Sequence, residues 1–171
     1  MQTMTSAYAN KMLKSLEEDK NFWVNKEAAS STYVAALNEE PVIPEYDYAA
    51  VAATIAEIDE KIAIIKHALN VTNATAKVQV GDAEMSIDTI LIKMAQLNKR
   101  KAVLDVLRKQ LPKARVDQHS YMSRNSVPEY KYINYDLELI KKEYESVSVK
   151  IMEMQMALDK YNQTVQFEVN I

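Results

Sequence analysis

The sequence of 171 residues contains no cysteine and one glycine, Gly81. Without cysteine there is no disulfide, no thiol nucleophile and no thiolate zinc site. Phosphate-binding loops and dinucleotide-binding turns need several glycines, because their backbone takes positive φ angles and comes close to phosphate. The single glycine therefore excludes these motifs, and it argues against a strand-rich fold with many tight turns.

Histidine is also scarce, with only His67 and His119. A catalytic zinc usually has three protein ligands, and a di-iron bundle needs Glu-x-x-His twice. The residues three positions before the histidines are Ile64 and Val116, so neither motif exists. We interpret both histidines as structural and predict no metal site.

Paired carboxylates occur at 17–19, 39–40 and 57–60, beside lysines on helix faces that read as exposed. General acid–base catalysis needs a carboxyl group in a cleft with a perturbed pKa, and a solvated helix face does not provide one. No Gly-x-Ser-x-Gly motif is possible with one glycine. The sequence therefore predicts no catalytic residue and no cofactor, and we expect a protein that is not an enzyme. A deep polar cleft holding His119 with carboxylates would revive an enzymatic function.

Abundant Ala, Glu, Lys, Ile and Met indicate long helices. Two segments, 47–70 and 135–161, carry apolar residues that alternate at intervals of three and four, which is a heptad seam that needs a partner helix. The seam of the first contains Tyr48, Val51, Ile55, Ile58, Ile62, Ile65 and Leu69. The seam of the second contains Leu137, Ile140, Tyr144, Val147, Ile151, Met154, Leu158 and Tyr161. The two seams are candidate partners, in one chain or between two copies.

Two further helices are less regular. Segment 86–111 ends before Pro112, and its stripe of Ile87, Ile90, Met94, Leu97, Leu104 and Leu111 is interrupted by Lys101 and Arg108. Segment 4–37 ends where Pro41 and Pro44 prevent a helix. It is too polar to be used fully in a compact bundle. We expect its Tyr8, Phe22 and Trp23 to be buried, with a second subunit as a natural place.

Short β elements complete the prediction. Residues 75–87 read as a hairpin that turns at Gly81-Asp82, with strands also at 127–134 and 164–171. The last two strands precede and follow the predicted helix at 135–161, and a helix of that length separates its ends by ~39 Å. We therefore expect the last two strands to pair with the hairpin or with another subunit. Residues 112–126 read as a polar loop.

The fold class predicted is mainly α: an antiparallel coiled-coil-like helical bundle of about four helices with a small antiparallel β element. We expect a single helical domain over residues 1–171. Within it, residues 1–37 form a long N-terminal helix that could serve as an oligomerisation arm. Residues 47–171 form the core, with the hairpin at 75–87 and the terminal strand at 164–170.

Charge is uneven along the chain. Residues 93–115 hold eight basic residues and one acidic residue, whereas residues 1–60 hold eleven acidic and four basic residues. The basic helix could bind nucleic acid or a phospholipid surface. Alternatively, it lies beside the acidic helices of the same or a neighbouring subunit, which we favour. The net charge of −3 argues weakly against a general nucleic-acid binder.

The chain resembles the septicolysin-like family of small bacterial helical proteins. The resemblance covers most of the chain and is strongest at NVTNATAKVQVGDAEMSIDTIL, residues 70–91, and at LDKYNQTVQFEV, residues 158–169. Where the family usually has tryptophan after the second motif's asparagine, this chain has Gln163. The resemblance implies a helical bundle with small β pieces, a bacterial or phage origin, and turns at Asn70, Asn73 and Asn162. It implies no activity.

We therefore expect a non-catalytic structural or interaction protein that self-associates through its helical seams as a homo-oligomer. A nucleic-acid-binding module using residues 93–115 is the alternative. No apolar segment is long enough to span a membrane and no secretion signal is seen. We expect a cytoplasmic location with no membrane contact.

Overall fold

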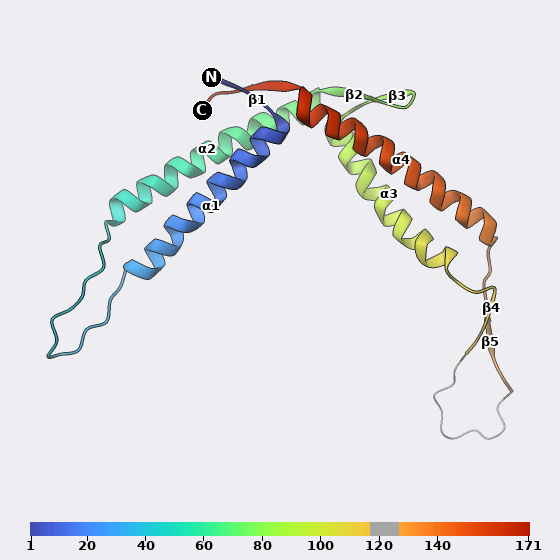
Figure 1. The fold of residues 1–171 in the computed structure, drawn as a ribbon, viewed down its shortest axis with the longest axis horizontal. Coiled ribbons are helices and arrows are strands. Elements are labelled where there is room, and N and C mark those ends of the chain that lie inside the picture. Colours follow the sequence, from blue (N-terminus) through green and yellow to red (C-terminus); the bar gives the residue numbers. More distant parts are fainter. Residues whose placement is uncertain (117–126) are drawn as a thin grey trace. The chain divides into compact units, whose positions relative to one another are not determined.

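The computed structural model describes residues 1–116 and 127–171 (Figure 1). The fold is mainly α with short antiparallel strand pairs, as predicted. The described part contains four helices: α1 (Ser6–Ser30), α2 (Tyr48–Thr75), α3 (Ile87–Arg108) and α4 (Leu137–Thr164). Its six strands are β1 (Gln2–Thr5), β2 (Lys77–Val80), β3 (Ala83–Ser86), β4 (Lys113–Arg115), β5 (Tyr130–Tyr132) and β6 (Gln166–Val169).

The chain divides into two compact units. The first consists of residues 1–78 and 158–171, and the second of residues 79–157. This division differs from the predicted single domain with a core at 47–171 and a separate N-terminal arm. Residues 6–30 are part of the first unit, because α1 packs along α2.

The core of the first unit is formed by α1, α2 and the β1–β6 pair. Its buried side chains are Met4, Ala9, Leu13, Ile65, Leu69 and Val169. The strands pair antiparallel from Gln2 opposite Val169 to Thr5 opposite Gln166. Thr5 then caps α1 by accepting a hydrogen bond from the backbone N–H of Tyr8 at 3.2 Å. The small strand pair thus holds the two chain ends together against the base of the α1–α2 hairpin (Figure 1).

The core of the second unit lies between α3 and α4. Leu104 is fully buried against Ile140 and Val147, and five partly buried side chains pack around them: Leu97, Leu107, Tyr135, Tyr144 and Ile151. The interruptions of the α3 stripe are explained by this interface. The Arg108 guanidinium lies 4.1 Å and the Lys101 ammonium 5.4 Å from the centre of the Tyr144 ring. Both cations occupy seam positions because an aromatic face meets them.

Both predicted seams turn toward other helices. Along α4, every seam residue is buried or half-buried. Along α2 the only exception is Tyr48, which is exposed at the first turn. The pairing differs from the one we considered, since α2 packs on α1 and α4 packs on α3. A regular seam requires an apolar partner surface, and the partner helix does not have to be equally regular.

Several boundaries differ from the sequence prediction. The first helix covers 6–30 and not 4–37, because residues 2–5 pair with β6 and the run Ser30-Ser31-Thr32 has weak helix propensity. The helix predicted to end at Asn70 continues to Thr75, and the one predicted to end before Asn162 continues to Thr164. In each case the terminal threonine donates its hydroxyl to the carbonyl four residues earlier, at 2.8 and 2.7 Å. The two asparagine motifs therefore lie within the last helical turns.

The hairpin at 75–87 is confirmed as β2–β3, where Gly81 takes a φ of +57° in the turn. The partners predicted for the other strands are wrong: β5 pairs with β4, and β6 pairs with β1. The strands β1 and β4 were not predicted. Each lies next to a helix end, β1 within residues that we assigned to a helix and β4 within residues that we assigned to a loop. The rest of the predicted loop, 117–126, lies outside the described residues.

Candidate interaction surfaces

The structure gives no support for a catalytic centre at the histidines. His67 is exposed on α2, and His119 lies outside the described residues. Over residues 1–116 and 127–171, no group of three His, Asp or Glu side chains could hold a metal ion. The paired carboxylates of the sequence lie on exposed helix faces or in the loop between α1 and α2.

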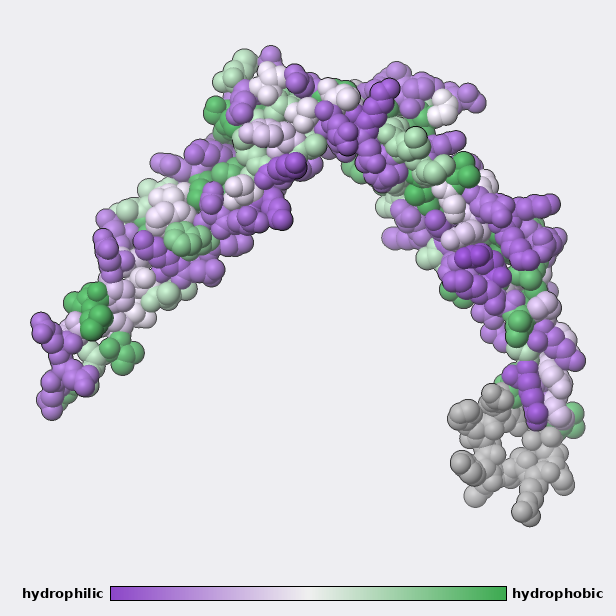
Figure 2. Space-filling model, viewed as in Figure 1, coloured by the Kyte–Doolittle hydropathy of each residue, from purple (hydrophilic) through white to green (hydrophobic). Residues whose placement is uncertain are grey.

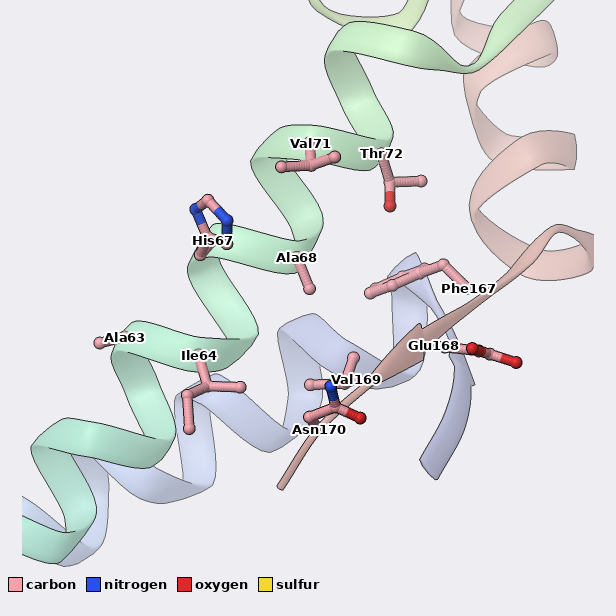
Figure 3. Close-up of a pocket in the computed structure, with 10 residues that line it drawn as sticks. All are labelled: Ala63, Ile64, His67, Ala68, Val71, Thr72, Phe167, Glu168, Val169 and Asn170. Atoms are coloured by element: carbon pink, nitrogen blue, oxygen red, sulfur yellow. The ribbon is translucent and has the colours of Figure 1, made fainter. Parts of the chain in front are cut away.

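An open groove of about 560 Å³ runs between α2 and β6. Figure 3 shows Phe167 directed toward Ala68 and Thr72, whereas Glu168 points away from the helix. The lining is mostly apolar: Ala63, Ile64, His67, Ala68, Val71, Thr72, Phe167, Glu168, Val169 and Asn170. The view places the imidazole of His67 on the far side from Glu168. The groove thus offers a shallow apolar surface and no acid–base pair.

The loop of residues 31–47 joins α1 to α2, and we name it the acidic loop. It contains four carboxylates and no basic residue: Glu39, Glu40, Glu45 and Asp47. Its apolar side chains are exposed to an unusual degree, at 100% for Val34, 101% for Leu37 and 89% for Val42. Loops of this length without secondary structure are uncommon in compact domains and are usually either functional or linker segments.

Two contacts fix the C-terminal end of the acidic loop. The Tyr46 hydroxyl donates a hydrogen bond to the Glu27 carboxylate of α1 at 3.1 Å. Desolvation and this carboxylate raise the pKa of Tyr46 above its ordinary value of 10.0. Asp47 caps α2 by accepting from the backbone N–H of Ala50 at 3.2 Å. The loop therefore enters α2 at a defined point.

At the far end of the α3–α4 hairpin, strands β4 and β5 form an antiparallel ribbon that we name the tyrosine ribbon. Lys113 faces Tyr132 and Arg115 faces Tyr130 across the pair. Directly opposite residues share one face of a sheet, so two cations and two tyrosines lie together. The Lys113 ammonium is 4.1 Å from the centre of the Tyr130 ring and 5.6 Å from that of Tyr132. All four side chains are exposed.

The ribbon is joined firmly to its hairpin. The Tyr135 hydroxyl donates to the backbone carbonyl of Leu107 at 2.7 Å, and the N–H of Ile133 donates to the carbonyl of Pro112 at 3.3 Å. Near the same helix end, Asp105 accepts from Arg108 at 2.6 Å and from Lys109 at 2.5 Å. These cations, with Lys109 the larger influence, hold the pKa of Asp105 below its ordinary value of 3.8.

Ion pairs join the two helices within each hairpin. On α1 and α2, Lys20 pairs with Asp59 at 2.6 Å and Lys66 with Glu17 at 3.1 Å. On α3, Arg100 pairs with Glu143 of α4 at 2.9 Å. Each hairpin therefore has ion pairs between its own two helices, and such exposed pairs add little stability.

The outer face of α4 carries a fourth surface. Val149, Met152 and Met156 recur at intervals of three and four, opposite the seam, and are 48%, 56% and 65% exposed. Met152, Met154 and Met156 alternate along this part of α4. Met154 lies in the core, whereas its two neighbours face outward. In Figure 2, apolar surface appears among polar groups on the helices of both hairpins.

The expected burial of the N-terminal aromatics is not observed within the chain. Phe22 is 62% exposed and Tyr8 is 49% exposed, and Trp23 is partly covered by Lys26 at 5.1 Å. The face of α1 that packs on α2 is formed by Ala9 and Leu13, with Met12 and Leu16 beside them. Trp23, seven residues after Leu16, is half-buried on the same side of the helix, whereas Tyr8 and Phe22 are exposed.

No protein-family model and no curated protein matches the sequence. The fold is similar to a crystal structure of a functionally unknown conserved protein from Corynebacterium diphtheriae. The two are 14% identical, with a TM-score of 0.65, over 98% of this chain and 100% of that chain. At this identity the similarity shows the fold alone. None of the described helices has an apolar stretch that could cross a membrane.

Proposed function

We propose that the protein is a non-catalytic structural or interaction protein that self-associates. The observation that supports this most directly is the strip of Val149, Met152 and Met156 on α4. Both regular seams are already covered inside the hairpins, so a surface for assembly has to lie elsewhere. Exposed apolar strips favour protein contacts, and methionine adapts to irregular partner surfaces.

The test is the molar mass of the intact chain by static light scattering at micromolar concentration. We expect a multimer for the natural sequence and a lower mass after Met152→Glu with Met156→Glu. Met152→Leu with Met156→Leu keeps the strip apolar and should leave the mass unchanged. A clean monomer for the natural sequence contradicts self-association.

Nucleic-acid binding is the second candidate, and the tyrosine ribbon favours it. Exposed cations interleaved with aromatic rings can neutralise phosphates and stack on bases of a single strand. Replacing Lys113 and Arg115 of the ribbon with Glu would then weaken binding, and the affinity would fall steeply with added salt. No binding of any oligonucleotide at ~50 mM salt rejects this candidate.

A further inference from the structure

The acidic loop and the tyrosine ribbon are opposite in charge and similar in being uncovered. The acidic loop has four carboxylates and no cation, whereas the ribbon strands present Lys113, Arg115 and Lys131. Val34 and Leu37 on one side, and Tyr130 and Tyr132 on the other, are exposed in the described chain. Each surface therefore combines charge with apolar area that the other could match.

Both surfaces contain elements that restrict their conformation before they meet a partner. The acidic loop contains no glycine, and Pro41 and Pro44 keep the residues before them extended. The ribbon is a paired strand element, tied to α3 through Tyr135. A pre-shaped surface loses less conformational entropy on binding than a flexible one.

We infer that the acidic loop of one copy docks on the tyrosine ribbon of a second copy. The carboxylates of Glu39, Glu40 and Glu45 meet the cations of Lys113 and Arg115, while the loop's aliphatic side chains cover the tyrosine rings. The inference rests on the proposed self-association and adds a second contact to the strip on α4. Because the two surfaces are different, the contact is heterologous, and repeating it gives a closed ring or an open filament.

A charge-swap experiment on the full chain tests this contact. The loop variant carries Glu39→Lys, Glu40→Lys and Glu45→Lys, and the ribbon variant carries Lys113→Glu, Arg115→Glu and Lys131→Glu. Sedimentation equilibrium at low salt should show that each variant alone self-associates with a Kd at least ~10-fold higher than the natural chain, because like charges meet. An equimolar mixture of the loop variant and the ribbon variant should restore association, because the lysines of one variant's loop face the glutamates of the other variant's ribbon.

A stronger test uses a six-fold variant, which carries the three loop changes and the three ribbon changes in one chain and is measured by itself. With both surfaces reversed, opposite charges face each other again, and self-association should return to within a few-fold of the natural Kd. A matched control reverses three exposed carboxylates on α1 and α2, Asp19→Lys, Glu57→Lys and Glu60→Lys, with the same change in net charge as the loop variant. That control should keep the natural Kd, because it alters neither surface.

The outcomes separate the two proposals. If the natural chain is a multimer and neither reversal changes its Kd, the docking is wrong and the proposed self-association stands. If the natural chain is a monomer at all concentrations, both are wrong. If the ribbon variant instead loses binding to a fluorescent oligothymidine while the loop variant self-associates normally, the ribbon serves nucleic acid and the inference is overturned.

Discussion

The α1–α2 and α3–α4 hairpins share one plan and use different side chains to stabilise it. In each, a helix with a regular apolar seam packs on a less regular one. The α1–α2 hairpin fills the contact with small and aliphatic residues such as Ala9 and Leu13. The α3–α4 hairpin adds an aromatic ring, Tyr144, beneath two cations. The comparison teaches that a regular apolar seam determines which face of its own helix is buried. It does not determine which types of side chain the partner helix supplies.

The far ends of the hairpins differ more than their cores. One ends in the acidic loop, where prolines prevent helix and strand alike, and the other ends in the tyrosine ribbon. Neither end is needed to close its core, since the buried residues of each hairpin lie on the helices and on the β1–β6 pair. The ends are therefore free to carry interaction surfaces of opposite charge.

The largest expected effect is on the two cores. Ile65→Ala and Leu104→Ala each remove a side chain that is fully buried. We expect each to lower the free energy of unfolding by ~2–5 kcal/mol, through lost burial and the cavity left behind. Urea denaturation followed by circular dichroism measures the loss. Hydrogen exchange should show protection lost mainly in the substituted unit.

Matched controls are Val71→Ala on α2 and Val106→Ala on α3, which remove exposed side chains of the same hairpins. Both should change the free energy of unfolding by less than ~0.5 kcal/mol. If Ile65→Ala and Leu104→Ala abolish protection equally in both units, the two hairpins behave as one cooperative structure and the comparison between separate cores fails.

The next effect concerns Asp47 and Asp136, which precede α2 and α4, the two helices with regular seams. Asp136 accepts hydrogen bonds from the backbone N–H groups of Glu138 and Leu139 at 2.9 and 3.2 Å, whereas Asp47 accepts one, from Ala50. Replacing either with Ala should cost ~0.5–2 kcal/mol, with the larger loss at Asp136. Thermal and urea unfolding measure this difference. Asn at either position keeps a capping oxygen and should restore most of the stability, and a larger loss at Asp47 would reverse the ranking.

The sequence predicted the seams because burial on one helix face leaves a period that needs no knowledge of the partner. It also located the β2–β3 hairpin, because Gly81-Asp82 is a local turn signal. The partner helices were not predictable in this way, since Lys101 and Arg108 read as faults in a stripe until Tyr144 is seen beneath them.

The strands β1 and β4 were missed for a related reason. Each is short and pairs with a segment far away in sequence or across a long loop, so no local period identifies it. The charged and aromatic residues of the ribbon were visible in the sequence, but their common face follows from the register of Lys113 with Tyr132. The sequence identified the acidic loop only as a segment that ends a helix. Its exposure depends on whether other parts of the fold pack against it, and no local pattern predicts that.

Two tyrosines of the α4 seam should respond in opposite directions. The buried hydroxyl of Tyr161 has no hydrogen-bond partner among the described residues, so Tyr161→Phe should leave stability unchanged or raise it by up to ~1 kcal/mol. Tyr144→Leu removes the ring beneath Arg108 and should cost ~0.5–1 kcal/mol. Tyr144→Phe keeps the ring and serves as the control. Urea unfolding measures all three, and a clear loss in Tyr161→Phe would mean that its hydroxyl is satisfied.

Alkaline titration sharpens the same contrast. Burial raises the pKa of Tyr161 above its ordinary value of 10.0. The unfolded chain then loses this proton at lower pH than the folded chain, so the free energy of unfolding falls as the pH rises above ~10. This fall should be smaller in Tyr161→Phe than in the natural chain.

The smallest expected effect tests whether ion pairs distinguish the hairpins. Lys109 and Arg108 lower the pKa of Asp105, so the folded chain keeps this carboxylate charged at a pH where the unfolded chain binds a proton. The contribution is present above the ordinary value of 3.8 and is lost as the pH falls through the lowered pKa. Asp105→Asn should therefore destabilise the chain slightly at neutral pH and not at the acid end of that window.

Added salt should reduce the difference in stability between the natural chain and Asp105→Asn, because solvent reaches the carboxylate. Glu57→Gln, an exposed carboxylate of α2, gives the same charge change, and urea midpoints measured across acid pH compare the two. If the urea midpoints of the natural chain and Asp105→Asn still differ below this pH window, the loss of stability comes from packing. The ion pairs of Asp105 would then not distinguish the two hairpins.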